Sequence, residues 1–75
     1  MFRLDIAELL KAAAAKGDRT GYAIHKRAGV AESSVYRYLR GQAQPDLISI
    51  LLLASAYDTT VEKLMPRADV ERIPA

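Results

Sequence analysis

The segment Gly21–Leu39, with the sequence GYAIHKRAGVAESSVYRYL, decides the fold of this chain. Glycine adopts the left-handed backbone conformation that ends one helix and turns the chain toward the next, and Gly29 stands near the middle of the segment. Apolar residues flank it at helical spacing: Ile24, Ala28, Val30, Val35 and Tyr38. The segment therefore predicts two short helices, joined at Gly29, whose apolar sides face each other.

Three further helices are predicted around this segment. Alanines 12–15 have the highest helix propensity, and they extend a first helix that ends near Lys16. The helix after Gly29 is expected at about residues 31–40, a fourth at 47–57, and a short fifth that begins at Thr59 or Thr60 and ends before Pro66. The chain is therefore expected to be all-α, with one domain over residues 1–66 and a short tail over 67–75.

Two polar residues mark helix starts. The side-chain oxygens of Thr20 and Asp46 are predicted to accept hydrogen bonds from first-turn amides, as N-cap residues do. The helix that follows Asp46 is apolar almost throughout, so we expect much of its circumference to be buried and the helix to be the central element of the core.

Composition excludes several classes of protein. The 75 residues contain no cysteine and one histidine, so no thiolate metal site is possible and no metal or other cofactor is expected. The longest apolar run, residues 50–54, is far shorter than the roughly 20 residues of a membrane span. Ser33 and Ser34 have no base beside them, so we expect no enzyme and no small-molecule substrate. The absence of cysteine fits a reducing, cytoplasmic location.

Charge is distributed unevenly along the chain. The whole chain has a net charge of +2, but residues 16–44 contain six basic and two acidic residues, whereas the remainder contains five basic and seven acidic ones. A basic segment of this kind suits a polyanionic partner, although a solvated surface without a partner has the same composition.

The sequence TGYAIHKRAGVAESSVYRYLRGQAQPDLISILLLASAYDTTVEKL, residues 20–64, resembles the lambda-repressor and Cro-like (XRE) family of helix-turn-helix regulators. The resemblance implies a five-helix DNA-binding domain whose second and third helices form the helix-turn-helix. It implies a transcriptional regulator, most often a repressor, that inserts helix 31–40 into the major groove of an operator. Such domains act in the bacterial cytoplasm or nucleoid and are frequent in phages and prophages.

Three positions depart from the family pattern. Gly21 stands where many members have a glutamine that contacts phosphate, so only a backbone amide can serve there. His25 stands where a small alanine is usual, at the close crossing of the two helices, and it is expected to pack or to make a polar contact between helices. Leu39 replaces a glutamate that pairs with an arginine of the first helix, and both charges are absent together.

By position, the resemblance assigns base reading to Glu32, Ser33, Tyr36 and Arg37. Arg37 suits guanine, whereas Glu32 suits cytosine N4 or the orientation of Arg37. Phosphate contacts are expected from Thr20, Gly21, Lys26, Arg27, Ser34, Arg40, Gln42 and Gln44. Lys26 and Arg27 also suit the negative end of a helix dipole, so a purely stabilising role is open for both.

The resemblance also implies a homodimer, at least on DNA, because one small domain covers a single half-site. Contacts near the last two helices and the tail are expected from Tyr57, Val61, Met65, Val70 and Ile73. Leu64, in contrast, is expected to belong to the core.

An alternative function is a protein-interaction module or antitoxin-like adaptor that keeps the fold. Glu32 in a reading position and the missing glutamine at Gly21 favour this alternative, and the basic excess opposes it.

Overall fold

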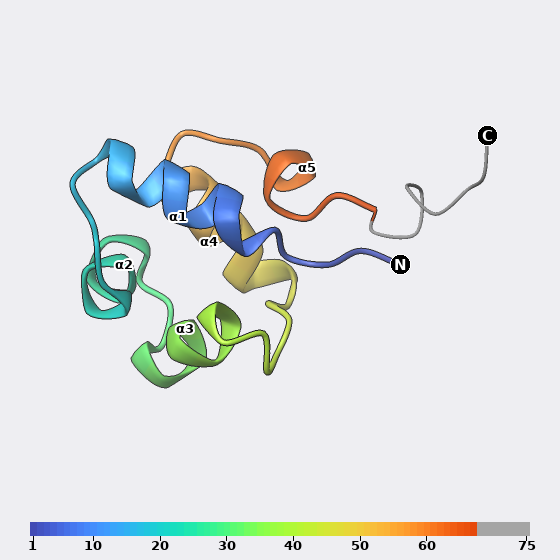
Figure 1. Cartoon of the computed structure of the whole chain (residues 1–75), viewed down its shortest axis with the longest axis horizontal. Helices are drawn as coiled ribbons and strands as arrows, with labels where there is room; N and C mark the ends of the chain where they lie inside the picture. The colour runs from blue at the N-terminus through green and yellow to red at the C-terminus, as the bar shows by residue number, and fades with distance from the viewer. Residues whose placement is uncertain (68–75) are drawn as a thin grey trace.

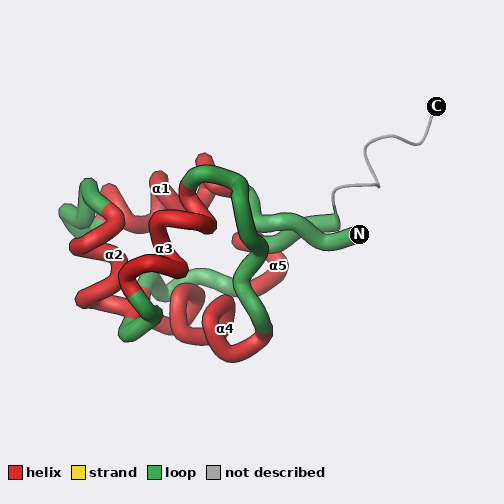
Figure 2. The backbone as a smooth tube through the Cα atoms, turned by 90° about the horizontal axis from the view of Figure 1, so that it is seen from below, coloured by secondary structure: helices red, strands yellow, loops and turns green. Residues whose placement is uncertain are grey.

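Five helices make up the structure of this chain, a computed structural model that describes residues 1–67 (Figure 1). They are α1 (Ile6–Ala15), α2 (Gly21–Ala28), α3 (Glu32–Leu39), α4 (Leu47–Ala56) and α5 (Val61–Leu64). The all-α, five-helix prediction is confirmed, and the predicted third helix is longer than α3 by one residue at each end. Viewed from below, α3 lies between α1 and α4 in projection (Figure 2).

Four of the five helices begin at a polar residue whose side chain accepts a hydrogen bond from a backbone amide of the first turn. The Thr20 hydroxyl accepts from the amide of Ala23 at 3.1 Å, and the Asp46 carboxylate accepts from the amide of Ser49 at 2.8 Å, as predicted. Thr60 caps α5 in the same way, and Asp5 caps α1. Each of these bonds satisfies an amide that has no partner within its helix.

Gly29 ends α2 with a φ of 78°, in the left-handed region that the sequence required there. Its amide donates to the carbonyl oxygen of His25 at 2.9 Å. A β-carbon at this position would meet nothing within 4 Å, so the backbone conformation, and not a lack of space, calls for glycine.

Each helix supplies one large side chain to the centre of the core, and α1 also supplies Ala13. The large residues, at most 1% exposed, are Leu9, Ile24, Val35, Leu53 and Leu64. Burial of one such side chain contributes about 1.5–3 kcal/mol, so the five together fix how the helices pack. Leu64 is fully buried, as expected.

The expectation that much of the circumference of α4 is buried holds for one face of this helix. Only Ile50, Leu53 and Ala54 of this helix are buried. The other large apolar side chains of α4 remain 40–69% exposed: Leu47, Ile48, Leu51 and Leu52. The physical reason is size, because so short a chain has too little other structure to cover the second face of an apolar helix.

Both ends of the described chain lie together, beside α5 (Figure 1). Phe2 and Arg67 form an isolated antiparallel bridge, and the amide of Asp5 donates to the carbonyl oxygen of Leu64 at 2.7 Å. The predicted tail therefore overlaps the described structure only at Arg67, and residues 68–75 lie outside it.

Asp18, in the connection between α1 and α2, joins two helices through its carboxylate. Its Oδ2 accepts from Nε of Arg27 at 2.5 Å and from the hydroxyl of Tyr57 at 2.8 Å, and the Asp18 side chain is only 11% exposed. The Arg27 and Tyr57 donors hold the pKa of Asp18 below its usual value. Burial and the bond to Asp18 raise the pKa of Tyr57 well above its usual value. This cluster links the ends of α2 and α4.

The core predicts a contrast between two adjacent leucines of α1. We expect Leu9→Ala to lower the free energy of unfolding by about 2–5 kcal/mol, because Leu9 is fully buried and its truncation leaves a cavity. The matched change Leu10→Ala, at a side chain that is 45% exposed, is expected to cost less than about 1 kcal/mol. Urea denaturation measures both, and equal losses would contradict the packing described.

The Asp18 cluster predicts a pH-dependent stability. Because the pKa of Asp18 is lowered on folding, its contribution is complete above its unfolded pKa of 3.8 and is lost as the pH falls through the lower folded value. Asp18→Asn is therefore expected to lower the thermal midpoint at pH 7, by an amount that shrinks below about pH 4.

The control for this experiment is Asp58→Asn. Asp58 pairs with Lys16 at 2.7 Å, but its side chain is 78% exposed. We expect its loss to have a small effect that 1 M salt removes, because exposed ion pairs are screened. The effect of Asp18→Asn should persist in salt, and its disappearance there would show that the cluster acts only as a surface ion pair.

Candidate nucleic-acid interface

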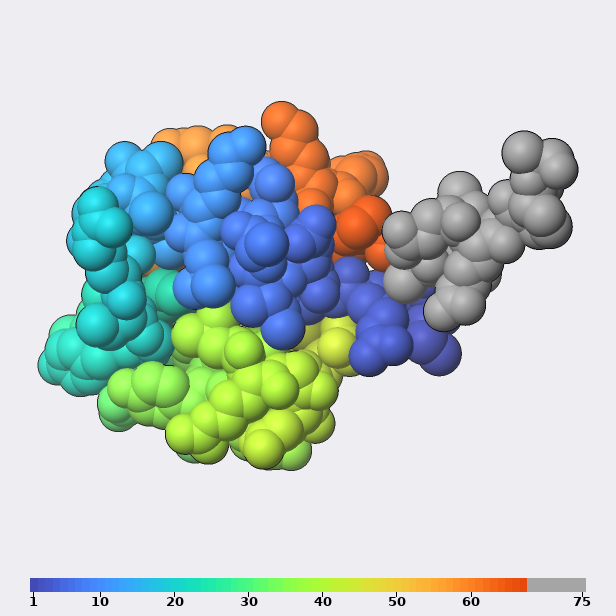
Figure 3. All heavy atoms as spheres, viewed as in Figure 1, coloured from blue at the N-terminus to red at the C-terminus, as the bar shows by residue number. Residues whose placement is uncertain are grey.

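The outer face of α3 is polar and open to solvent. Val35 and Tyr38 are buried toward the core. Glu32, Ser33 and Arg37 are exposed on the other face, and Tyr36 is half-buried beside them. In the space-filling view, residues of α3 and the loop after it form the lower surface, next to α2 (Figure 3). The four residues predicted to read bases therefore share one surface of one helix.

The start of α2 is in contact with this face. A β-carbon on Gly21 would lie 2.4 Å from Cε1 of Tyr36 and 2.7 Å from Cδ1, closer than carbon atoms approach. The ring of Tyr36 thus lies directly over the backbone of Gly21. In the sequence, the absence of a side chain at Gly21 was interpreted as the loss of a phosphate contact. In the structure, that absence leaves room for the ring of Tyr36.

Tyr36 also binds Glu32. Its hydroxyl donates to Oε2 of Glu32 at 3.2 Å, between residues one turn apart on α3. Partial burial and this bond raise the pKa of Tyr36 above its usual value. The sequence suggested that Glu32 orients Arg37, but in the structure the partner of Glu32 is Tyr36. Within residues 1–67, Arg37 has no ion pair.

His25 contacts the turn between α2 and α3 through its side chain. Its Nδ1 lies 2.7 Å from the carbonyl oxygen of Val30 and, since a carbonyl only accepts, carries the proton in this contact. The ring of Tyr22 packs against that of His25, with centroids 5.8 Å apart, and Nζ of Lys26 lies 5.8 Å from the centre of the Tyr22 ring. His25 therefore makes a polar contact to the turn that follows its own helix, and not the contact between helices that the sequence suggested.

The basic residues of segment 16–44 divide into two groups. Lys16 and Arg27 are paired with Asp58 and Asp18. The other four have no ion pair within residues 1–67: Arg19, Lys26, Arg37 and Arg40. Sequence reasoning counted Arg19 in the charge but did not propose it as a contact, and it missed Asp18. Arg27 is held by a carboxylate, which favours its stabilising role.

The remaining residues predicted to contact phosphate have different surroundings. The Thr20 hydroxyl caps α2. Ser34 is half-buried and Gln42 is exposed. The side-chain oxygen of Gln44 accepts from the amide of Leu4 at 2.7 Å, which fixes the segment before α1 and leaves the Gln44 NH₂ group as a donor.

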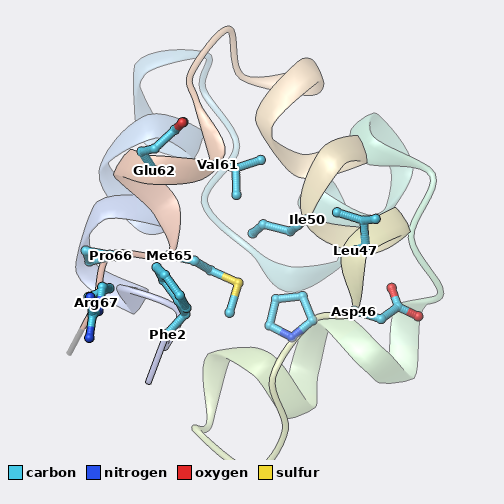
Figure 4. Close-up of a pocket in the computed structure, with 10 residues that line it drawn as sticks. Phe2, Asp46, Leu47, Ile50, Val61, Glu62, Met65, Pro66 and Arg67 are labelled. Atoms are coloured by element: carbon cyan, nitrogen blue, oxygen red, sulfur yellow. The ribbon is translucent and has the colours of Figure 1, made fainter. Parts of the chain in front are cut away.

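The residues predicted to form the dimer contact do not share one exposed surface. Tyr57 is buried, with its hydroxyl on Asp18, whereas Val61 and Met65 are half-buried at a groove of about 700 Å³ (Figure 4). Val70 and Ile73 lie outside the described residues.

Residues 1–67 show neither a metal-binding cluster nor a membrane-spanning helix. No group of three or more histidine, cysteine, aspartate and glutamate side chains in this range is arranged to hold a metal ion. None of the helices in the same range has the length and apolar character of a membrane span.

Comparisons with known proteins agree with this geometry. No curated protein sequence matches the chain significantly. Among solved structures, the restriction-modification controller protein C.AhdI from Aeromonas hydrophila is similar, with a TM-score of 0.65 and 29% sequence identity over 77% of this chain and 86% of that one. The helix-turn-helix family matches residues 10–64, from α1 to the end of α5. This chain belongs to the XRE-like helix-turn-helix family of DNA-binding transcriptional regulators.

Proposed function

We propose that this protein is a sequence-specific repressor that inserts α3 into the major groove of double-stranded DNA. The observation that carries the proposal is the exposed polar face of α3, flanked on or beside α2 and α3 by cations that have no ion pair within residues 1–67. An α-helix with its side chains is about 10–12 Å across, close to the width of the major groove. Bound across a promoter, such a domain blocks transcription.

Individual roles follow from the chemistry of the bases. Arg37, which has no ion pair within residues 1–67, is proposed to donate two hydrogen bonds to guanine. Glu32 is proposed to accept from cytosine N4, and Ser33 to contact a neighbouring base. Lys26 and Arg40, with the first amides of α2, are proposed to bind phosphates and so to fix the position of α3.

The similarity to C.AhdI supports a regulatory role. That protein is a restriction-modification controller, and it shares both the fold and 29% of aligned residues with this chain. We propose that this protein likewise controls the expression of specific genes in a bacterial cytoplasm, through an operator that remains to be identified.

Selection of bound duplexes from a random pool tests the proposal, and the expected result is a consensus with two related half-sites. Arg37→Ala is expected to relax preference at one base pair, by about 5- to 150-fold, because a bidentate contact to guanine is lost. Lys26→Ala is expected to weaken all sequences alike and to reduce the slope of log affinity against log salt by about 1 per site.

Arg27→Ala is the matched control for Lys26→Ala, one residue along the same helix. Because Arg27 binds Asp18, we expect its loss to lower the thermal midpoint more than it changes the salt dependence. Should no duplex be retained at low salt, the repressor proposal fails and the alternative, a protein-interaction module, is the remaining interpretation.

We further propose that two copies associate through the exposed face of α4, formed by Leu47, Ile48, Leu51 and Leu52. These side chains follow one another at helical spacing and are 40–69% exposed. The face has no charged residue, so a second copy meets it without like-charge repulsion in a two-fold arrangement.

The groove beside α4 extends this apolar face. In Figure 4, Ile50, Val61 and Met65 point toward a common space whose rim includes Leu47. A stable dimer buries about 800 Å² on each partner. The four leucine and isoleucine side chains supply the apolar centre of such an interface, and the groove supplies its margin. This surface shares Val61 and Met65 with the predicted one but leaves out Tyr57, which is buried.

The dimer proposal predicts that Ile48→Glu gives a monomer. In the dimer, a carboxylate at this position would be buried against either the same carboxylate of the second copy or an apolar side chain. Burial of an unpaired charge disfavours association. Sedimentation at micromolar concentration is expected to show a dimer for the wild type and a monomer for the variant. Affinity for a two-half-site duplex should fall at least about tenfold.

The matched control is Leu10→Glu, because Leu10 is also apolar and exposed but lies on α1. It is expected to leave both the sedimentation coefficient and DNA affinity unchanged. A wild-type protein that remains monomeric on a duplex with two half-sites would refute the proposed interface.

A further inference from the structure

We infer that Gly21, Tyr36 and Glu32 form one positioning unit, in which Tyr36 sets DNA sequence preference by fixing the carboxylate of Glu32. This inference rests on the proposed function, because it assigns the way in which that same face of α3 reads a base pair. Tyr36 is thereby a positioning residue, and Glu32 is the residue that contacts the base.

The ring of Tyr36 occupies the space over the backbone of Gly21. This glycine is buried, and a β-carbon built on it lies 2.4 Å and 2.7 Å from two ring atoms of Tyr36. Any other residue at this position therefore displaces the ring. The seat of the ring on α2 is available only because α2 begins with glycine.

The hydrogen bond on α3 joins Tyr36 to Glu32. With its ring seated over Gly21, Tyr36 donates its hydroxyl to Oε2 of Glu32 at 3.2 Å. Glu32 is exposed, and an exposed glutamate side chain otherwise samples many rotamers. The bond restricts it before DNA arrives, which lowers the entropy that binding must remove.

The Glu32 carboxylate keeps acceptor positions that the bond to Tyr36 does not use. An ionised carboxylate has about four acceptor positions, and the Tyr36 hydroxyl uses one of them. Glu32 can still accept from an amino group such as cytosine N4. The Tyr36 hydroxyl, in contrast, has already donated its single proton to Glu32.

A double-mutant cycle separates positioning from direct reading. The measured quantity is discrimination, the ratio of affinities for the selected site and for the site changed at the base pair that Glu32→Ala relaxes. Tyr36→Phe keeps the ring and removes the hydroxyl, and we expect it to reduce discrimination about two- to tenfold. In the Glu32→Ala background, Tyr36→Phe is expected to have no effect on this ratio.

Gly21→Ala tests the seat of the ring without a change on α3. Alanine favours the helix, so the variant is expected to remain folded. NMR of the tyrosine rings without DNA should show a shift for Tyr36 and little change for the buried Tyr38 and Tyr57, and discrimination should fall as in Tyr36→Phe. The control Tyr22→Phe removes a neighbouring hydroxyl that does not bond to Glu32, and it should leave discrimination unchanged.

The outcomes are distinguishable from failure of the proposed function. If the wild type selects no DNA, the proposed function fails, whereas the NMR comparison still reports whether the ring is seated on Gly21. If the wild type selects a consensus but Tyr36→Phe retains full discrimination, the positioning inference is wrong. It is equally wrong if Tyr36→Phe lowers discrimination by the same factor in the Glu32→Ala background, since Tyr36 then reads the base directly.

Discussion

The rest of the structure depends on the burial of one large side chain from each helix in a common core. Ile24 and Val35 enter this core from α2 and α3, and neither has more than 1% of its surface exposed. A helix anchored in this way cannot rotate about its axis without exposing its apolar residue or burying a charged one. The polar face of α3 is outward for this reason, and the ring of Tyr36 meets the first residue of α2 at a fixed place.

Local features of the fold could be predicted from the sequence because their causes are local. Thr20 and Asp46 cap their helices through amides three residues away, and Gly29 reverses the chain through its own dihedral angles. Features that depend on packing between distant segments could not be predicted. Asp18 and Tyr57 are 39 residues apart, and no pattern relates them. The exposure of α4 has the same origin, because its composition says only that the helix is apolar.

The candidate site shows the same division. The resemblance placed Glu32, Ser33, Tyr36 and Arg37 on one face, where Glu32, Ser33 and Arg37 are exposed and Tyr36 is half-buried. It treated Gly21 as a missing contact, whereas the structure shows that this glycine accommodates Tyr36. Charge alone also overstated the number of available cations, since Lys16 and Arg27 are already bound to carboxylates. Which basic residues are free is a property of the fold and not of the composition.

The bridge between Phe2 and Arg67 has a consequence for the topology of the chain. Because Phe2 and Arg67 are neighbours, a short peptide can connect them without disturbing any helix. The order in which the helices follow one another is then not essential to the core. A circularly permuted chain, opened at an exposed connection remote from α3, would assemble the same five helices around the same centre.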